Sequence, residues 1–188
     1  MELYIKTFIV FFIIFFIPIV GIPAQHAESG VLYFHVIDEE ETLVFNNYYN
    51  QNPRSTFNER GELLHPNLVS SEVIILPVFE MGQQRTNEHG NPDFVAIRTG
   101  IRLDRNLIQE VNMETHIFSG EPLISFTLTP EGGVMFFNYT MRNIGELMVI
   151  VLNNQVRVIA RIIAPIREAG MIQGFNVEEA MMIYDLLK

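Results

Sequence analysis

Apolar and polar residues alternate most regularly between residues 122 and 129, which read PLISFTLT. Ile124, Phe126 and Leu128 take every second position, and polar residues stand between them. A period of two is typical of a strand that buries one face and exposes the other. The pattern therefore predicts a half-buried strand over residues 122–129.

A helix is predicted directly after this strand. Thr129 can cap the first turn, Pro130 suits the first helical position, and Glu131 interacts favourably with the helix dipole. Gly145 is placed to end the helix. Apolar residues recur at spacings of three and four, which predicts a buried stripe formed by Val134, Phe137, Met141 and Ile144.

A hairpin is predicted next. Residues 146–152 read ELMVIVL and indicate a buried strand, and Asn153 and Asn154 can adopt the positive φ angles of a tight turn. Residues 155–163 then form the returning strand. Its alternation predicts a core-facing set, Val156, Val158, Ala160 and Ile162, and a water-facing pair, Arg157 and Arg161.

The last predicted elements are a short strand over residues 170–174 and a helix over residues 176–188. Asn176 and Glu179 have the spacing of a capping box, in which each side chain bonds the other residue's backbone N–H. The apolar stripe predicted for this helix consists of Val177, Ala180, Met181, Tyr184 and Leu187.

The pattern is less regular in the first part of the chain. Residues 31–37 are rich in β-branched and aromatic residues and predict a strand, which the mostly acidic residues 38–42 end. Residues 46–67 are crowded with Asn, Pro and Gly. That composition predicts a long exposed loop or a poorly ordered insertion.

Four further segments follow this loop. Residues 70–80 predict a second strand, and Pro77 places it at a sheet edge or at a bulge. Residues 81–92 predict a turn, and residues 93–100 predict a short third strand. Residues 102–115 fit either a helix or an extended chain. The order of elements as a whole predicts an α+β fold, with helices packed on one face of an antiparallel sheet.

A hydrophobic helix is predicted to precede this body, because residues 7–24 carry no charge. The apolar stretch is longer than a usual signal-peptide core and at the lower limit for a membrane span. Residues 1–29 are therefore expected to be either a signal peptide, with cleavage after Ser29, or a single transmembrane anchor. Either alternative places the body on the extracytoplasmic side of the membrane.

Composition and charge exclude several classes of protein. The chain has 188 residues and a formal net charge of −10, which disfavours nucleic acid as a partner. It contains no cysteine, which excludes disulfides, iron–sulfur clusters, thiolate zinc sites and attachment of lipid to an N-terminal cysteine.

Motifs for chemistry are missing from the sequence. The five histidines lack the spacing of a helical zinc site, and the acids at 38–41 lack the glycine-containing pattern of a calcium loop. Gly132 and Gly133 could approach a phosphate, but no basic residue stands beside them. A glycosylation sequon at residues 138–140 falls inside a predicted helix and is interpreted as coincidental. We therefore predict no catalytic, cofactor-binding or metal-binding residues, and a binding protein rather than an enzyme.

Ordered apolar and glycine positions resemble a known family. They resemble the first periplasmic domain of SecD, the accessory subunit of the bacterial Sec protein-export machine, strongly over the last 66 residues and loosely over most of the chain from residue 30. Residues 46–67 depart from the family pattern. The matching positions are Phe126 to Thr129, Gly132 and Gly133, Phe137 to Thr140, Asn143 to Gly145, Val149 to Val156, and Ile172 to Leu187.

The resemblance implies a division of the chain and a role. Residues 30–121 would be an N-terminal part with a long variable loop, and residues 122–188 a SecD-head-like α+β domain. The implied role is the movable head that contacts emerging polypeptide or translocase subunits, without catalytic residues or cofactor. Proton coupling is not expected of this chain, because its hydrophobic segment carries no ionisable group. Exposed sheet edges offer a physical route to peptide binding. The alternative is a stand-alone exported binding or scaffold domain with no remaining Sec role.

Overall fold

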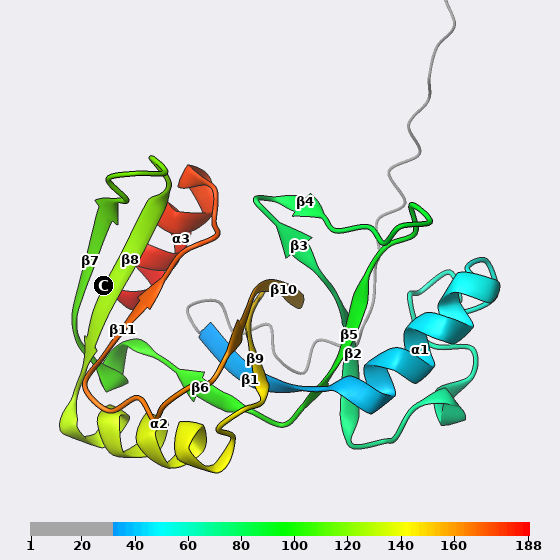
Figure 1. Cartoon of the computed structure of the whole chain (residues 1–188), viewed down its shortest axis with the longest axis horizontal. Coiled ribbons are helices and arrows are strands. Elements are labelled where there is room, and N and C mark those ends of the chain that lie inside the picture. Colours follow the sequence, from blue (N-terminus) through cyan, green and yellow to red (C-terminus); the bar gives the residue numbers. More distant parts are fainter. Residues whose placement is uncertain (1–31) are drawn as a thin grey trace, which may run out of the picture.

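The computed structural model describes residues 32–188 and shows an α+β fold with three α-helices and antiparallel sheets (Figure 1). The predicted fold class is thereby confirmed. The hydrophobic helix and the leader or anchor at residues 1–29 lie outside the described residues. No helix within residues 32–188 has the length and apolar character needed to cross a bilayer.

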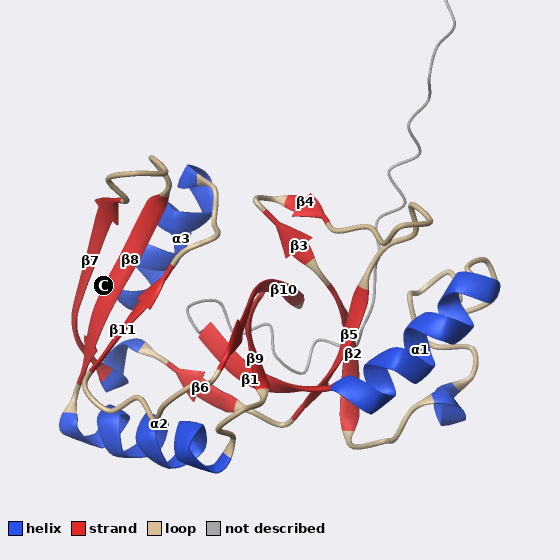
Figure 2. Cartoon of the chain, in the orientation of Figure 1, coloured by secondary structure: helices blue, strands red, loops and turns tan. Residues whose placement is uncertain are grey.

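The strands form two main sheets instead of one (Figure 2). The larger sheet has the order β10-β9-β1-β5-β2, and β6 pairs with β1. It curves round until its two edge strands meet, where Val78 bridges Val156. Its strands are β1 (Leu32–Asp38), β2 (Val73–Pro77), β5 (Phe94–Arg98), β6 (Ile101–Leu103), β9 (Leu147–Leu152) and β10 (Gln155–Arg161).

The smaller sheet has the order β11-β8-β7, with β7 (Ile108–Thr115), β8 (Pro122–Leu128) and β11 (Ala169–Ile172). Helix α3 (Val177–Leu187) packs against one face of it, behind β8 and β11 in Figure 1. The alternation predicted for residues 122–129 is confirmed, because Ile124, Phe126 and Leu128 are buried in the core against α3. The division into an N-terminal part, residues 30–121, and a head-like domain, residues 122–188, stays a prediction.

Helix α1 (Glu39–Gln51) corrects the expectation of a loop from residue 46. Asp38 ends β1 and caps the helix, because its carboxylate accepts from the backbone N–H of Glu41. The acidic run therefore forms a first helical turn, where the helix dipole favours negative charge. Phe45 and Tyr49, one turn apart, bury their rings against Phe94 of β5. This aromatic cluster outweighs the weak helix propensity of the asparagines.

The segment from residue 52 to β7 is mainly irregular chain and short strands. It contains a 3₁₀ turn (Pro66–Leu68) before β2, and Pro77 lies on an edge strand as predicted. The expected turn at residues 81–92 begins as the turn of a small hairpin, which pairs β3 (Phe79–Glu80), at the end of the predicted second strand, with β4 (Gln83–Gln84). Residues 102–115 are extended apart from a second 3₁₀ turn (Arg105–Leu107), which resolves their ambiguity.

Helix α2 (Pro130–Arg142) is capped by Thr129 as predicted, but the predicted stripe is wrong. Val134, Met141 and Ile144 are exposed, and the helix instead buries Phe136 and Thr140. The two glycines of its first turn decide this orientation. A Cβ on either would lie within 2.4 Å of a backbone oxygen, of Leu107 or of Arg167, so only glycine allows this close packing.

The hairpin of β9 and β10 has its turn where predicted, with Asn153 at φ 51° and Asn154 at φ 58°. The register shifts between Val156 and Val158, which interrupts the expected alternation. Val156 is buried as predicted, whereas Ala160 is exposed and Arg157 points into the molecule.

Helix α3 has the predicted capping box between Asn176 and Glu179. Its apolar stripe is only partly as predicted: Ala180 and Leu187 are buried, but Val177 and Met181 are exposed. The buried face includes Ile183 and Glu179 instead, because Glu179 is drawn inward to meet the guanidinium of Arg157.

Candidate functional site

A cleft of about 820 Å³ lies between the two sheets. One wall is the chain of β10 at Val158–Ala160, and the other is β11 with the residues that follow it to Gly174. Apolar side chains of the main core, including Phe34, Phe136 and Ile150, form the floor. The cleft is therefore an apolar groove bounded on both sides by extended backbone.

The wall formed by β11 is an open strand edge. The backbone N–H of Leu128 donates to the carbonyl oxygen of Glu168 at 2.8 Å, immediately before β11 begins. Facing residues of antiparallel strands alternate between bonded and non-bonded pairs, so Gly170 and Ile172 bond β8. The N–H and C=O groups of Ala169 and Met171 consequently point away from β8, where no described strand pairs with them.

The other sheet edges carry features that discourage strand addition. Strand β2 ends in Pro77, which has no N–H to donate, and β10 has a register shift near its covered end. Strand β7 carries the exposed glutamates Glu110 and Glu114. Strand β11 has neither charge, proline nor bulge, so it is the described edge best suited to accept another strand.

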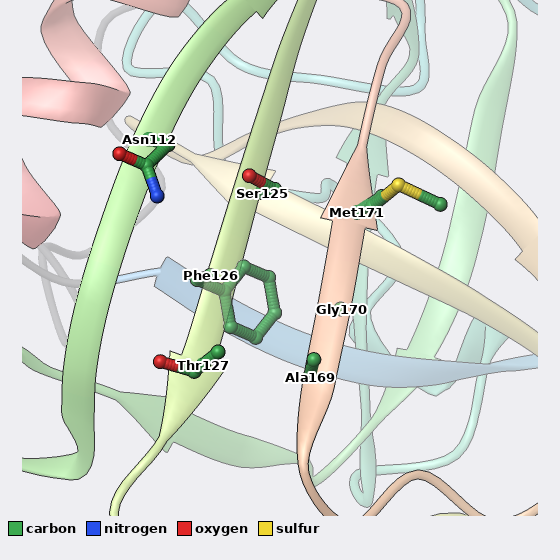
Figure 3. A pocket seen from close by; sticks show the side chains of 7 residues that line it. All are labelled: Asn112, Ser125, Phe126, Thr127, Ala169, Gly170 and Met171. Atoms are coloured by element: carbon green, nitrogen blue, oxygen red, sulfur yellow. The ribbon is translucent and has the colours of Figure 1, made fainter.

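A second, shallower hollow of about 340 Å³ lies on the exposed face of the smaller sheet (Figure 3). The larger side chains of Asn112 and Met171 stand at its two sides. The small residues between them on β8 and β11 are Ser125, Thr127, Ala169 and Gly170. The ring of Phe126 extends toward β11 beside Gly170 in this view. A Cβ on Gly170 would lie 2.5 Å from the ring Cζ of Phe126. Glycine is therefore required here for β11 to lie flat beside β8.

Arg157, on the wall formed by β10, pairs with Glu179 of α3 near one end of the cleft. The guanidinium of Arg157 also donates to Gln155 at 2.6 Å and lies 5.0 Å from the ring centroid of Phe79. Burial lowers the pKa of Arg157 from its usual value, and the carboxylate of Glu179 opposes that shift. The ion pair fixes β10 relative to α3.

Thr140 of α2 fixes the chain that precedes β11, which forms the other wall of the cleft. Its buried hydroxyl donates to the carbonyl oxygen of Phe136 at 2.8 Å and accepts from the backbone N–H of Ile166 at 2.9 Å. Ile166 lines the cleft and leads into β11. Helix α2 therefore positions the chain that delivers the open edge.

The residues weighed for chemistry in the sequence do not gather at one place. Within residues 32–188, no three His, Asp or Glu side chains lie close enough together to hold a metal ion. His35 is buried, and its Nδ1 lies 2.9 Å from the carbonyl oxygen of Arg98. Gly132 and Gly133 pack closely on the backbone of Leu107 and Arg167, which accounts for both glycines without a ligand.

Sequence reasoning missed the residues that line the cleft. The signal available was the stretch 169–172, which is uncharged and free of proline next to an alternating strand. It indicates a strand, but nothing local shows that its outer edge stays open.

Comparison with known proteins gives consistent matches. The model of the SecDF P1 head subdomain family matches residues 80–188. The protein translocase subunit SecD of Treponema pallidum (strain Nichols) is 29% identical over 163 residues, which are 85% of this chain and 27% of that protein. The chain thus spans well under half the length of this relative.

Two solved structures are also similar. One is of SecDF, a membrane component that enhances protein export; it has 23% sequence identity and a TM-score of 0.49, and the match covers 85% of this chain and 62% of that one. The other is of SecDF in its super-membrane-facing form, with 24% identity and a TM-score of 0.49, over 85% of this chain and 18% of that one.

Proposed function

Because the chain belongs to the SecDF P1 head subdomain family, we propose that it assists Sec-dependent protein export by binding an extended segment of exported polypeptide along β11. The binding is non-enzymatic. The polypeptide adds a strand to the smaller sheet and lies in the cleft between β11 and β10.

The open edge of β11 is the observation that carries this proposal. Its outward N–H and C=O groups, at Ala169 and Met171, supply sequence-independent hydrogen bonds to an extended chain. Such bonds suit a protein that must bind many different polypeptides, because every backbone offers the same groups. The apolar floor of the cleft adds affinity for every second side chain of the added strand.

The placement of the protein is part of the same proposal. The body lies on the extracytoplasmic side, where exported polypeptide emerges, and residues 1–29 deliver it there as an anchor or as a cleaved signal. Translocase subunits are the proposed partners. A stand-alone exported binding domain would use the same cleft without them. Affinity capture of the full chain from detergent-solubilised membranes separates the two, because only the first enriches Sec translocase subunits.

Paired proline variants test strand addition. Met171→Pro removes one outward N–H of β11, and Met113→Pro removes one outward N–H of β7, which lies at the other edge of the same sheet. Both leave the hydrogen bonds to β8 in place. Binding of a fluorescent, reduced and carboxymethylated polypeptide to the full-length chain is measured for each variant.

The proposal predicts that Met171→Pro weakens this binding about five- to tenfold, because one hydrogen bond to the polypeptide is lost and the proline ring clashes with the added strand. Met113→Pro leaves it within about twofold, since the β7 edge does not bind. Equal effects of the two substitutions would contradict strand addition at β11. Thermal unfolding of both variants checks that the fold is retained.

A further inference from the structure

The hairpin between β7 and β8 exposes two adjacent large apolar side chains at its tip. Ile117 is 90% exposed and Phe118 is 92% exposed, whereas the core of the smaller sheet buries Ile124, Phe126, Leu128 and Ile172. Gly120, at φ 72°, turns the chain back into β8. Neither side chain contributes to the core, so folding does not explain this pair. An exposed apolar patch of this kind marks a contact surface.

The tip stands at the mouth of the cleft described above. His116 and Glu121, which flank the tip, both line that cleft. Met81, on the turn of the β3–β4 hairpin, lines the same cleft and is 46% exposed. The β7–β8 and β3–β4 hairpins stand on the same side of the molecule (Figure 1), and residues of both line the cleft.

Strand β11 leads to the same opening. Gln173 and Gly174 follow β11 directly and line the cleft together with His116 and Glu121. A strand added along β11 therefore passes this end of the cleft as it leaves the sheet. Side chains just beyond the added strand come within reach of both hairpin tips.

Resting on the proposed function, we propose that Ile117, Phe118 and Met81 form an apolar mouth that gives the cleft its substrate preference. The mouth binds large apolar side chains of the extended polypeptide. Glu114 and Glu121 flank the tip along the chain, and their negative charges favour a lysine or arginine in the bound segment. The preferred segment is thus extended, apolar and basic.

Charge favours a basic polypeptide segment at the mouth over a second copy of the chain or an anionic bilayer. A second copy of the chain also carries a formal charge of −10, so like charges oppose tip-to-tip association. An anionic bilayer surface repels the glutamates beside the tip for the same reason. A basic and apolar segment of polypeptide is complementary to the tip in both charge and polarity.

Two matched peptides test the mouth with the full-length chain. Both are extended twelve-residue peptides with one lysine, and they differ only in whether two neighbouring positions hold Leu and Phe or two serines. Wild type is expected to bind the apolar peptide about tenfold more tightly, as burial of part of two large side chains allows. The double variant Ile117→Ser with Phe118→Ser is expected to bind both peptides with the affinity that wild type has for the serine peptide.

Met171→Pro distinguishes the contribution of the apolar mouth from that of strand addition along β11. It is expected to weaken both peptides by the same factor and to keep the tenfold preference. Met171→Pro could leave the affinity for both peptides unchanged while the double serine variant abolishes the preference for the apolar peptide. That result would contradict strand addition along β11 and support the apolar mouth. An unchanged preference in the double serine variant overturns the mouth. Sedimentation tests for dimers and vesicle flotation tests for bilayer binding. The apolar mouth is also contradicted if wild type dimerises or binds bilayers and the double serine variant does neither.

Discussion

Arg157 on β10 and Glu179 on α3 form an ion pair that connects the curved sheet to the helix of the smaller sheet. Their side chains are 12% and 10% exposed, so both charges depend on each other for solvation. The same glutamate completes the capping box of α3 by accepting from the backbone N–H of Asn176 at 3.1 Å. One buried charge pair therefore ties β10, which forms one wall of the cleft, to α3.

Neutralising Glu179 is predicted to destabilise the fold. Glu179→Gln keeps the size of the side chain and its capping bond but leaves the buried guanidinium of Arg157 without a counter-charge. The free energy of unfolding should fall by about 3 kcal/mol. Denaturant titration measures it. The control is Glu146→Gln, which breaks an exposed pair with Arg98 and should cost less than about 1 kcal/mol.

A rescue experiment distinguishes lost charge from lost packing at this pair. Replacing both partners with apolar residues, Arg157→Met with Glu179→Leu, removes the buried charges together and should recover much of the lost stability. Equal stability of wild type and Glu179→Gln would show that the pair does not join the two sheets in solution.

Gly170 is predicted to be intolerant of alanine because of Phe126. The new Cβ would lie 2.5 Å from the ring Cζ, so Gly170→Ala should reduce the free energy of unfolding by about 1–3 kcal/mol. Phe126→Leu shortens the ring side chain and relieves that contact. In a double-mutant cycle the two substitutions together should therefore cost less than the sum of the single costs. Additive costs would mean that β11 does not lie against the ring.

Tyr139 is predicted to make stability fall at alkaline pH. Burial raises the pKa of Tyr139 to about 12, although nearby Arg98 opposes the shift. Above pH 10 the unfolded chain loses this proton while the folded chain keeps it, so the free energy of unfolding decreases as pH rises toward 12. The slope contributed by one tyrosine is at most about 1.4 kcal/mol per pH unit.

Tyr139→Phe should flatten that slope. Because the buried hydroxyl has no hydrogen-bond partner among residues 32–188, the variant should also be as stable as wild type at pH 7 or more stable by up to about 1 kcal/mol. Urea titrations at pH 7, 10 and 11 measure both effects. The same alkaline slope in wild type and variant would place Tyr139 in water.

Local signals in the sequence predict the elements between residues 122 and 188 well. A cap at Thr129, a turn at Asn153 and Asn154, and a capping box at Asn176 and Glu179 each act within a few residues, so they can be read without tertiary structure. The fold class follows from their order.

Buried faces and sheet partners could not be predicted in the same way. Val134 and Met141 have helical spacing but are exposed, because the glycines at the start of α2 fix which face approaches the sheets. Helix α1 was missed because its stability comes from Phe45 and Tyr49 packing on a strand that lies far along the chain. The cleft depends on two sheets facing each other, and no local pattern records that arrangement.

Amide hydrogen exchange tests the central claim most directly. In the full-length chain, the N–H groups of Ala169 and Met171 face the open edge of β11 and should exchange quickly. Saturation with a reduced, carboxymethylated polypeptide should slow exchange at both by at least about tenfold, and leave the outward N–H of Met113 on β7 unchanged. Unchanged exchange at Ala169 and Met171 in the saturated complex would contradict strand addition and, with it, the proposed mode of polypeptide binding.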